Sequence, residues 1–179
     1  MNANDIITYW FKTLKPKDWF VKNTELDAYI RRNYSIIHAS IEKDEQAHWR
    51  ESDAGRLAEI IVLDQFSRNM FRGKAEAFAF DEQALALSKA AIDAGSHMRL
   101  TQVEINFLLM PFMHSESLAE HQAARPLFEQ YASPGTLDFE HKHCKIIEQF
   151  GRYPHRNKIL DRISSREETQ FLTKAGSSF

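Results

Sequence analysis

Apolar residues recur at spacings of three and four along most of the chain, and this periodicity predicts α-helices. In the first such segment Ile6, Trp10 and Leu14 fall on one helical face, and Pro16 follows its end. No window alternates apolar and polar residues for long enough to predict a β-strand. The chain also has only 6 glycines and 5 prolines, which disfavours a turn-rich β protein. The sequence therefore predicts an all-α fold.

Capping and helix-ending residues divide this pattern into eight helical segments. Capping boxes are expected for Thr101 with Glu104 and for Ser164 with Glu167, because each pair can satisfy two otherwise unbonded backbone amides. Gly151 is a typical residue for the end of a helix. The expected segments span residues 6–14, 24–41, 53–71, 81–92, 101–110, 118–131, 139–150 and 164–172.

The connections between these segments are short, so consecutive helices are expected to pack as antiparallel hairpins. Pro111 and Pro126 are expected to kink, end or interrupt the helices that contain them, because proline lacks a backbone donor. No linker or low-complexity stretch divides the 179 residues. We expect a single domain over residues 1–179, with a frayed tail at 174–179.

Charge and cysteine content exclude several classes of protein. The formal charge of -2 gives no basic excess of the kind that nucleic acid or an anionic membrane surface attracts. The single cysteine, Cys144, cannot form an internal disulfide. The longest apolar run, residues 107–113, is too short to span a membrane, and the first residues do not form a targeting segment. We therefore expect a cytoplasmic protein that binds neither nucleic acid nor membranes.

Three polar motifs stand at the ends of apolar segments. They are residues 64–69 (D-Q-F-S-R-N), 110–116 (M-P-F-M-H-S-E) and 148–157 (E-Q-F-G-R-Y-P-H-R-N). Asp64 and Arg68 share the stripe that should face the core, and removing an ion pair from water costs several kcal/mol per ion. Either this pair forms a structural network inside the core or it lines a pocket.

Arginines in the last motif favour recognition of an anion. The planar guanidinium of Arg152 or Arg156 can bind a carboxylate or phosphate through two parallel hydrogen bonds. In the alternative interpretation, these arginines satisfy helix carbonyls and internal acids. The leading hypothesis is a small anionic ligand held by arginines that Asp64 and Glu116 orient. The predicted ligand-binding residues are Asp64, Arg68, His114, Glu116, His143, Arg152, His155 and Arg156.

Histidines offer a second interpretation, a hydrolase with His114 or His143 as its general base. His143 lies on an expected apolar face with Phe139, where a histidine is most often a core residue bonded to a helix end or a carboxylate. Cys144 points away from His143 on a helix and is interpreted as a small buried residue. Ser115 follows His114, but no G-x-S-x-G motif is present.

Metal-binding motifs are absent from the sequence. It contains no H-E-x-x-H, no C-x-x-C and no repeated E-x-x-H pair. Asp64, His114, Glu116, His143 and His155 could each supply a ligand, but their spacing does not form a known metal motif. No metal and no other cofactor are expected.

Several motifs together resemble DUF924, a bacterial family of uncharacterised proteins. They lie at residues 9–11, 19–20, 63–73, 110–116 and 150–157, and residues 164–172 resemble the family's closing segment. Asp161 stands where the family often has glycine. The resemblance implies an all-helical, tetratricopeptide-like fold and carries no known activity. Because stacks of helical hairpins often bind peptides on a concave surface, a protein-interaction module is a further alternative.

Overall fold

The structure is a computed structural model that describes residues 1–177, and these residues form helices and turns without a β-strand. The expected all-α class is confirmed. The α-helices are α1 (Ala3–Thr8), α2 (Thr24–Glu42), α3 (Asp53–Ile60), α4 (Ser67–Met70), α5 (Asp81–Asp93), α6 (Gln102–His114), α7 (Leu118–Tyr131), α8 (Pro134–Phe150) and α9 (Arg166–Leu172). Two π-helical turns, η1 (Tyr9–Thr13) and η4 (Ile61–Phe66), extend α1 and join α3 to α4.

When α3, η4 and α4 are counted as one continuous helix, the described helices match the eight expected segments. This helix begins at Ser52, whose hydroxyl accepts a hydrogen bond from the Gly55 amide at 3.1 Å. Every residue of its π-helical turn is buried. A π-helical turn inside an α-helix is rare and frequently marks a functional site.

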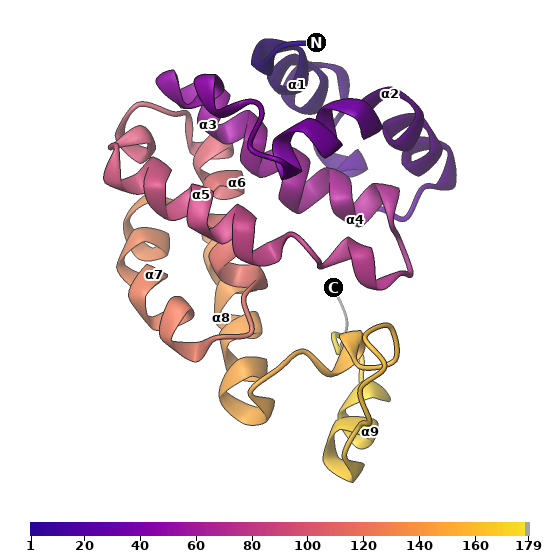
Figure 1. Ribbon diagram of the computed structural model, residues 1–179. Coiled ribbons are helices and arrows are strands. Elements are labelled where there is room, and N and C mark those ends of the chain that lie inside the picture. Colours follow the sequence, from indigo (N-terminus) through magenta and orange to yellow (C-terminus); the bar gives the residue numbers. More distant parts are fainter. Residues whose placement is uncertain (178–179) are drawn as a thin grey trace.

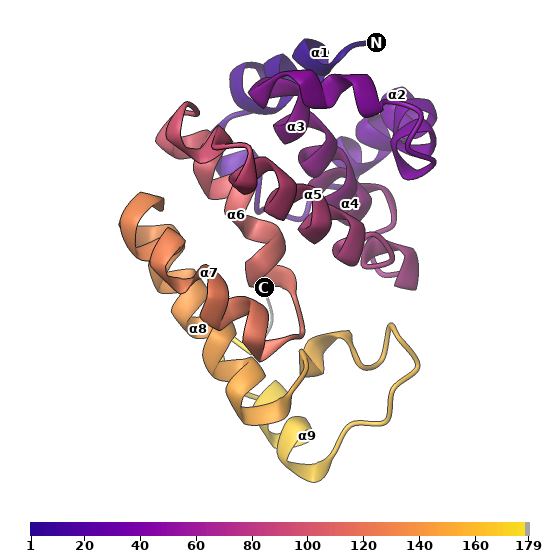
Figure 2. The ribbon, with the colours of Figure 1, turned by 60° about the vertical axis from the view of Figure 1, so that its left-hand side comes forward.

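Helix α6 lies between α3 and α5 on one side and α7 and α8 on the other (Figures 1 and 2). It contributes to two hydrophobic cores. Phe107 and Leu108 belong to a core shared with α1, α2, the α3–α4 helix and α5. Leu109 and Phe112 belong to a second core shared with α7. Because α6 is apolar on nearly all sides, it can only be stable in such a buried position. The C-terminal residue of α6, His114, therefore lies at the end of the helix that contributes to both cores.

Helices α7 and α8 pack side by side as an antiparallel hairpin below α6 (Figure 2). After α8, the chain passes through η7 (Pro154–Arg156) and a long connection before α9. No helix within residues 1–177 is long and apolar enough to cross a membrane.

Three local expectations were wrong. Pro111 and Pro126 do not interrupt α6 and α7, because burial of the helix faces outweighs the loss of one backbone hydrogen bond in each. The last capping box lies one residue later than expected, between Ser165 and Glu168. The buried face of α8 also excludes Phe139, which is 51% exposed. The side chain of Glu140 is buried in its place.

Two further local features lie at Asp161 and at the last described residues of the chain. Asp161 has a φ of 52°, in the left-handed region that glycine adopts most easily, which explains why glycine suits this position. Residues 174–177 form turns, and the hydroxyl of the buried Ser177 donates to the Leu172 carbonyl at 3.2 Å. Residues 178–179 of the expected frayed tail lie outside the described residues.

Gly135 in α8 and Gly151 directly after it give a test of backbone conformation. At Gly151 φ is 67°, and an added Cβ would meet no heavy atom within 4 Å there or at Gly135. Gly151→Ala is therefore expected to lower the free energy of unfolding by about 1–2 kcal/mol through backbone strain alone. Gly135→Ala is the matched control, expected to raise it by about 0.5 kcal/mol through helix propensity. Urea unfolding measures both, and equal effects would contradict the assigned backbone conformations.

Candidate functional site

The three polar motifs meet around the C-terminal end of α6. Asp64 comes from the π-helical turn η4, His114 ends α6, and Arg156 ends η7. A fourth residue, Asp81, opens α5 and bridges the arginines of this group. Asp64, Arg68, Asp81, His114 and Arg156 are called the central cluster below.

Asp64 is the most buried member of the central cluster, with 1% of its surface exposed. Its Oδ1 lies 2.6 Å from Nδ1 of His114 and 3.0 Å from Nη1 of Arg68. Gln65 donates to the other carboxylate oxygen. Burial alone would raise the pKa of Asp64, but Arg68 and His114 more than offset it and hold that pKa below its usual range. The carboxylate is therefore ionised at neutral pH.

His114 is held in one tautomer by this contact. Burial, and then the charge of Arg68, lower the pKa of His114 below its ordinary value, although Asp64 acts in the opposite direction. A neutral imidazole beside an ionised carboxylate donates its Nδ1 proton and keeps a lone pair on Nε2. The side chain is 16% exposed, so solvent reaches it.

Asp81 connects the two arginines of the central cluster. Arg68 donates to both of its carboxylate oxygens, at 2.9 and 3.1 Å, and Arg156 donates to one of them at 3.1 Å. The sequence pattern identified Asp81 only as the first residue of a helix, so this role was missed. No periodicity or spacing signal connects it with Arg156, which lies 75 residues later.

Arg156 is enclosed by two aromatic rings. Its guanidinium carbon lies 4.6 Å from the ring centroids of both Phe78 and Tyr153, and its Nη2 donates to the His114 carbonyl at 2.9 Å. Burial lowers the pKa of Arg156. Tyr153 is fully buried and donates its hydroxyl to the Met113 carbonyl at 2.5 Å. Through its hydrogen bond to the His114 carbonyl, Arg156 thus fixes the backbone at His114.

The architecture and these motifs agree with the comparisons with known proteins. A family model described as bacterial protein of unknown function, DUF924, matches residues 6–176. The chain belongs to this family. A solved structure of a protein of unknown function from Agrobacterium tumefaciens is 35% identical, with a TM-score of 0.90, and the match covers 95% of this chain and 96% of that chain. None of the curated proteins matches the chain.

Two of the predicted ligand-binding residues lie outside the central cluster and bind other partners. Arg152 forms a two-pronged ion pair with Glu168, at 2.7 and 2.8 Å, and donates to the Ile163 carbonyl. Glu116 was expected to orient the arginines of the site. Instead it accepts from Arg162 at 2.6 and 2.9 Å and from the Tyr153 amide, so it fastens η7 and the following connection to the segment between α6 and α7.

The remaining predicted histidines border the central cluster. The centroid of the His143 ring lies 6.4 Å from that of His114, and its Nδ1 donates to the Phe139 carbonyl at 2.8 Å. Burial lowers the pKa of His143 to about 3. His155 packs on Tyr153, with ring centroids 5.5 Å apart, and burial lowers its pKa to about 4. Both histidines are therefore neutral at neutral pH.

The charges of the central cluster cancel. Asp64 and Asp81 carry two negative charges and Arg68 and Arg156 carry two positive charges, while His114 is neutral. These contacts correspond to the structural-network interpretation of the sequence. Binding of a ligand by the same residues remains a prediction. A separate group of side chains between α7 and α8, described below, has ligand atoms close enough for a metal ion.

Proposed function

We propose that this protein is an enzyme of the hydrolase type, with His114 as its general base. The observation that carries the proposal is the 2.6 Å contact between His114 Nδ1 and the buried carboxylate of Asp64. It directs the lone pair of Nε2 away from Asp64 on a partly exposed side chain. A base oriented in this way by a carboxylate is the arrangement that proton abstraction requires.

In the proposed reaction, Nε2 of His114 accepts a proton from a water molecule as the water oxygen attacks an electrophilic carbon. The bond to the leaving group then breaks, and the imidazolium returns the proton to that group. Asp64 stabilises the imidazolium while it exists. Arg68 and Arg156 position the residues around His114 and do not transfer protons themselves.

The charge balance favours a neutral substrate. Each arginine of the central cluster already faces Asp81, so no uncompensated positive charge is left to attract an anion. An uncharged ester or amide fits this balance better than a phosphate. The earlier hypothesis of an anionic ligand would require one of these ion pairs to open.

The test is hydrolysis of a panel of uncharged chromogenic esters and amides. His114→Ala is expected to lower kcat/KM by at least about a hundredfold, which is typical for loss of a general base. Asp27→Asn is the matched control, because Asp27 forms a similar buried network with Arg72 and Asn69 away from His114. Turnover that survives in His114→Ala, or a wild-type protein that hydrolyses none of the panel, would contradict the proposal.

The pH profile gives a second test of the same residue. The active form has neutral His114, whose pKa is lowered from 6.5. Activity is therefore expected to rise with pH below 6.5 and to level off above it, as protonated His114 loses its proton. Residual turnover in His114→Ala should lack this rising limb. Stabilisation by inorganic phosphate without any turnover would favour the anionic-ligand alternative instead.

A further inference from the structure

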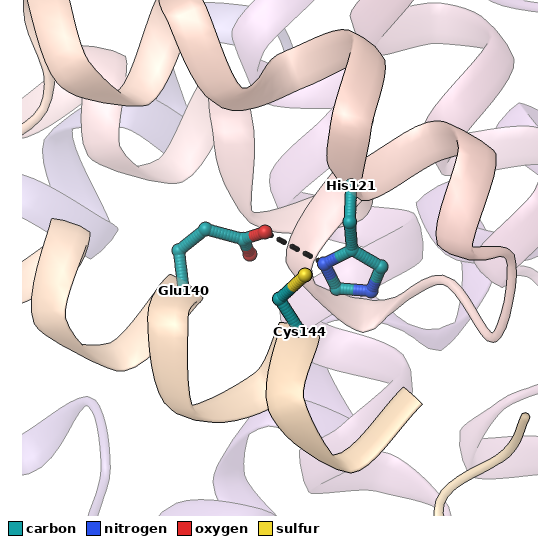
Figure 3. A group of neighbouring side chains, drawn as sticks. All are labelled: His121, Glu140 and Cys144. Atoms are coloured by element: carbon teal, nitrogen blue, oxygen red, sulfur yellow. Dashed lines mark hydrogen bonds and ion pairs between the residues drawn. The ribbon is translucent and has the colours of Figure 1, made fainter. Parts of the chain in front are cut away.

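Three side chains with different metal-binding atoms face one another between α7 and α8 (Figure 3). His121 comes from α7, and Glu140 and Cys144 come from consecutive turns of α8. One nitrogen, one carboxylate oxygen and one sulfur atom of this group lie within 4.8 Å of one another. Among the described residues, this is the group of three or more possible ligands whose atoms lie this close together.

His121 is oriented as a metal ligand is. Its Nε2 lies 2.9 Å from the Ser115 carbonyl oxygen, which can only accept, so Nε2 carries a proton. Histidines that bind metals usually donate their other ring proton to a carbonyl or carboxylate in this way. The second nitrogen, Nδ1, points toward Glu140 and Cys144 (Figure 3).

Glu140 provides an independent indication of a cation site. It is only 3% exposed, and its Oε1 lies 2.6 Å from His121 Nδ1. Its other oxygen, Oε2, is buried without a hydrogen-bond partner among residues 1–177. A buried carboxylate oxygen without a partner is costly, and a bound cation would remove that cost.

We propose that His121 Nδ1, the Glu140 carboxylate and Cys144 Sγ bind a zinc ion. Imidazole, carboxylate and thiolate are all zinc ligands, and the thiolate excludes the harder cations magnesium and calcium. With one carboxylate, one thiolate and a neutral imidazole, Zn²⁺ gives a site without net charge, which suits its burial. Zinc replaces the proton between His121 and Glu140 and the thiol proton of Cys144.

Small side-chain movements suffice for binding. Ligand atoms around one zinc ion lie about 3–4 Å apart, so His121 Nδ1 and Glu140 Oε1, now 2.6 Å apart, must separate by about 1 Å. Atoms separated by up to 4.8 Å must approach by about 1 Å. Cys144 is partly exposed and provides the entry path. The exposed Glu148 lies one turn further along α8, with an oxygen 3.7 Å from Cys144 Sγ. A water molecule, which keeps the set of ligands neutral, can supply the fourth ligand and donate a hydrogen bond to Glu148.

Sequence motifs did not predict this site, because its ligands follow an unusual pattern. Glu140, Cys144 and Glu148 repeat every four residues on one face of α8, and His121 comes from the neighbouring helix. The site is independent of the proposed hydrolase reaction, since none of its residues belongs to the central cluster. Zinc would connect α7 to α8.

The test is a titration of the metal-free, tag-free full chain with Co²⁺ and then with Zn²⁺. Co²⁺ bound to a thiolate is expected to give a charge-transfer absorption in the near ultraviolet, which Zn²⁺ then abolishes by displacement. Zinc is also expected to raise Tm by several degrees at saturating concentration. A wild-type protein that shows neither the absorption nor the shift in Tm overturns the proposal.

Three variants assign the metal to these residues. Cys144→Ser should abolish the absorption, and Glu140→Gln, which keeps the side-chain shape, should weaken zinc binding at least about tenfold. Circular dichroism checks that each variant is folded. Because Cys144 is partly exposed and Glu140 is buried, Cys144→Ser is expected to disturb the fold less than Glu140→Gln. His141→Ala removes an exposed histidine of the same helix and should leave affinity unchanged. Loss of binding in this control, or unchanged affinity in Glu140→Gln, overturns the proposal.

Discussion

Stability is expected to fall steeply when the pH is lowered from about 6.5 to about 4. Burial lowers the pKa of His38 and of His155 from 6.5 to about 4 in the folded protein. His114 is shifted in the same direction. Between the two pKa values the unfolded chain holds protons that the folded protein does not, so unfolding takes up protons and acid favours it.

The size of this effect follows from the shifts. Each pKa unit corresponds to about 1.4 kcal/mol, so His38 alone can contribute about 3 kcal/mol at pH 4. His38 and His155 together would lower the free energy of unfolding by roughly 3–6 kcal/mol, a large part of the total stability of a typical domain. This contribution is absent above pH 6.5, where histidine is neutral in both states.

Urea unfolding between pH 4 and pH 8 measures this dependence. The control variant is His38→Gln, whose amide can replace the 2.8 Å hydrogen bond between His38 Nε2 and the Ser67 hydroxyl. This variant is expected to take up about one proton fewer on unfolding, and so to have a shallower slope. A stability that stays constant between pH 6.5 and pH 4 would show that these histidines are not held neutral by burial.

Replacing Asp64 by asparagine is expected to lower the free energy of unfolding by about 3 kcal/mol. Removing one partner of a buried ion pair typically costs about 3–5 kcal/mol, because the other charge is left uncompensated. Arg68 keeps Asp81 as a second partner, which places the cost at the lower end of this range. The central cluster then carries a net positive charge.

A double-mutant cycle isolates the contribution of the pair. Asp64→Asn combined with Arg68→Met restores neutrality, so the double variant should be more stable than the sum of the single effects predicts. Asp27→Asn is the matched control, because Asp27 pairs with an arginine that is more accessible to water. The side chain of Arg72 is 35% exposed, whereas that of Arg68 is 20% exposed. It should cost less than Asp64→Asn. Additive single effects would mean that Asp64 and Arg68 are not coupled.

The pH dependence of the Asp64 contribution has a separate window. Its pKa is lowered in the folded state from a reference value of 3.8, so its stabilisation is complete above that value and declines as the pH falls below it. The difference in the free energy of unfolding between wild type and Asp64→Asn should therefore become smaller below about pH 4, which is close to the reference pKa of Asp.

Local patterns in the sequence were sufficient to identify the polar residues that deserved attention. Asp64 and Arg68 are four residues apart, so helix geometry alone predicts that they meet, and their 3.0 Å contact confirms it. Pro111 was expected to disturb its helix, but α6 continues through Pro111 and ends at His114. Arg152 was grouped with Arg156 by sequence, yet Arg152 pairs with Glu168 of α9 and Arg156 pairs with Asp81 of α5.

Fold class, helix order and the polar motifs were determined by the sequence itself, because helical periodicity and capping depend on residues only three or four positions apart. The tertiary structure decided which charges meet. Asp81 pairs with Arg156 across 75 residues, and Glu140 meets His121 through the packing of α8 on α7. Such contacts depend on how helices pack against one another, and no spacing along the chain encodes that packing.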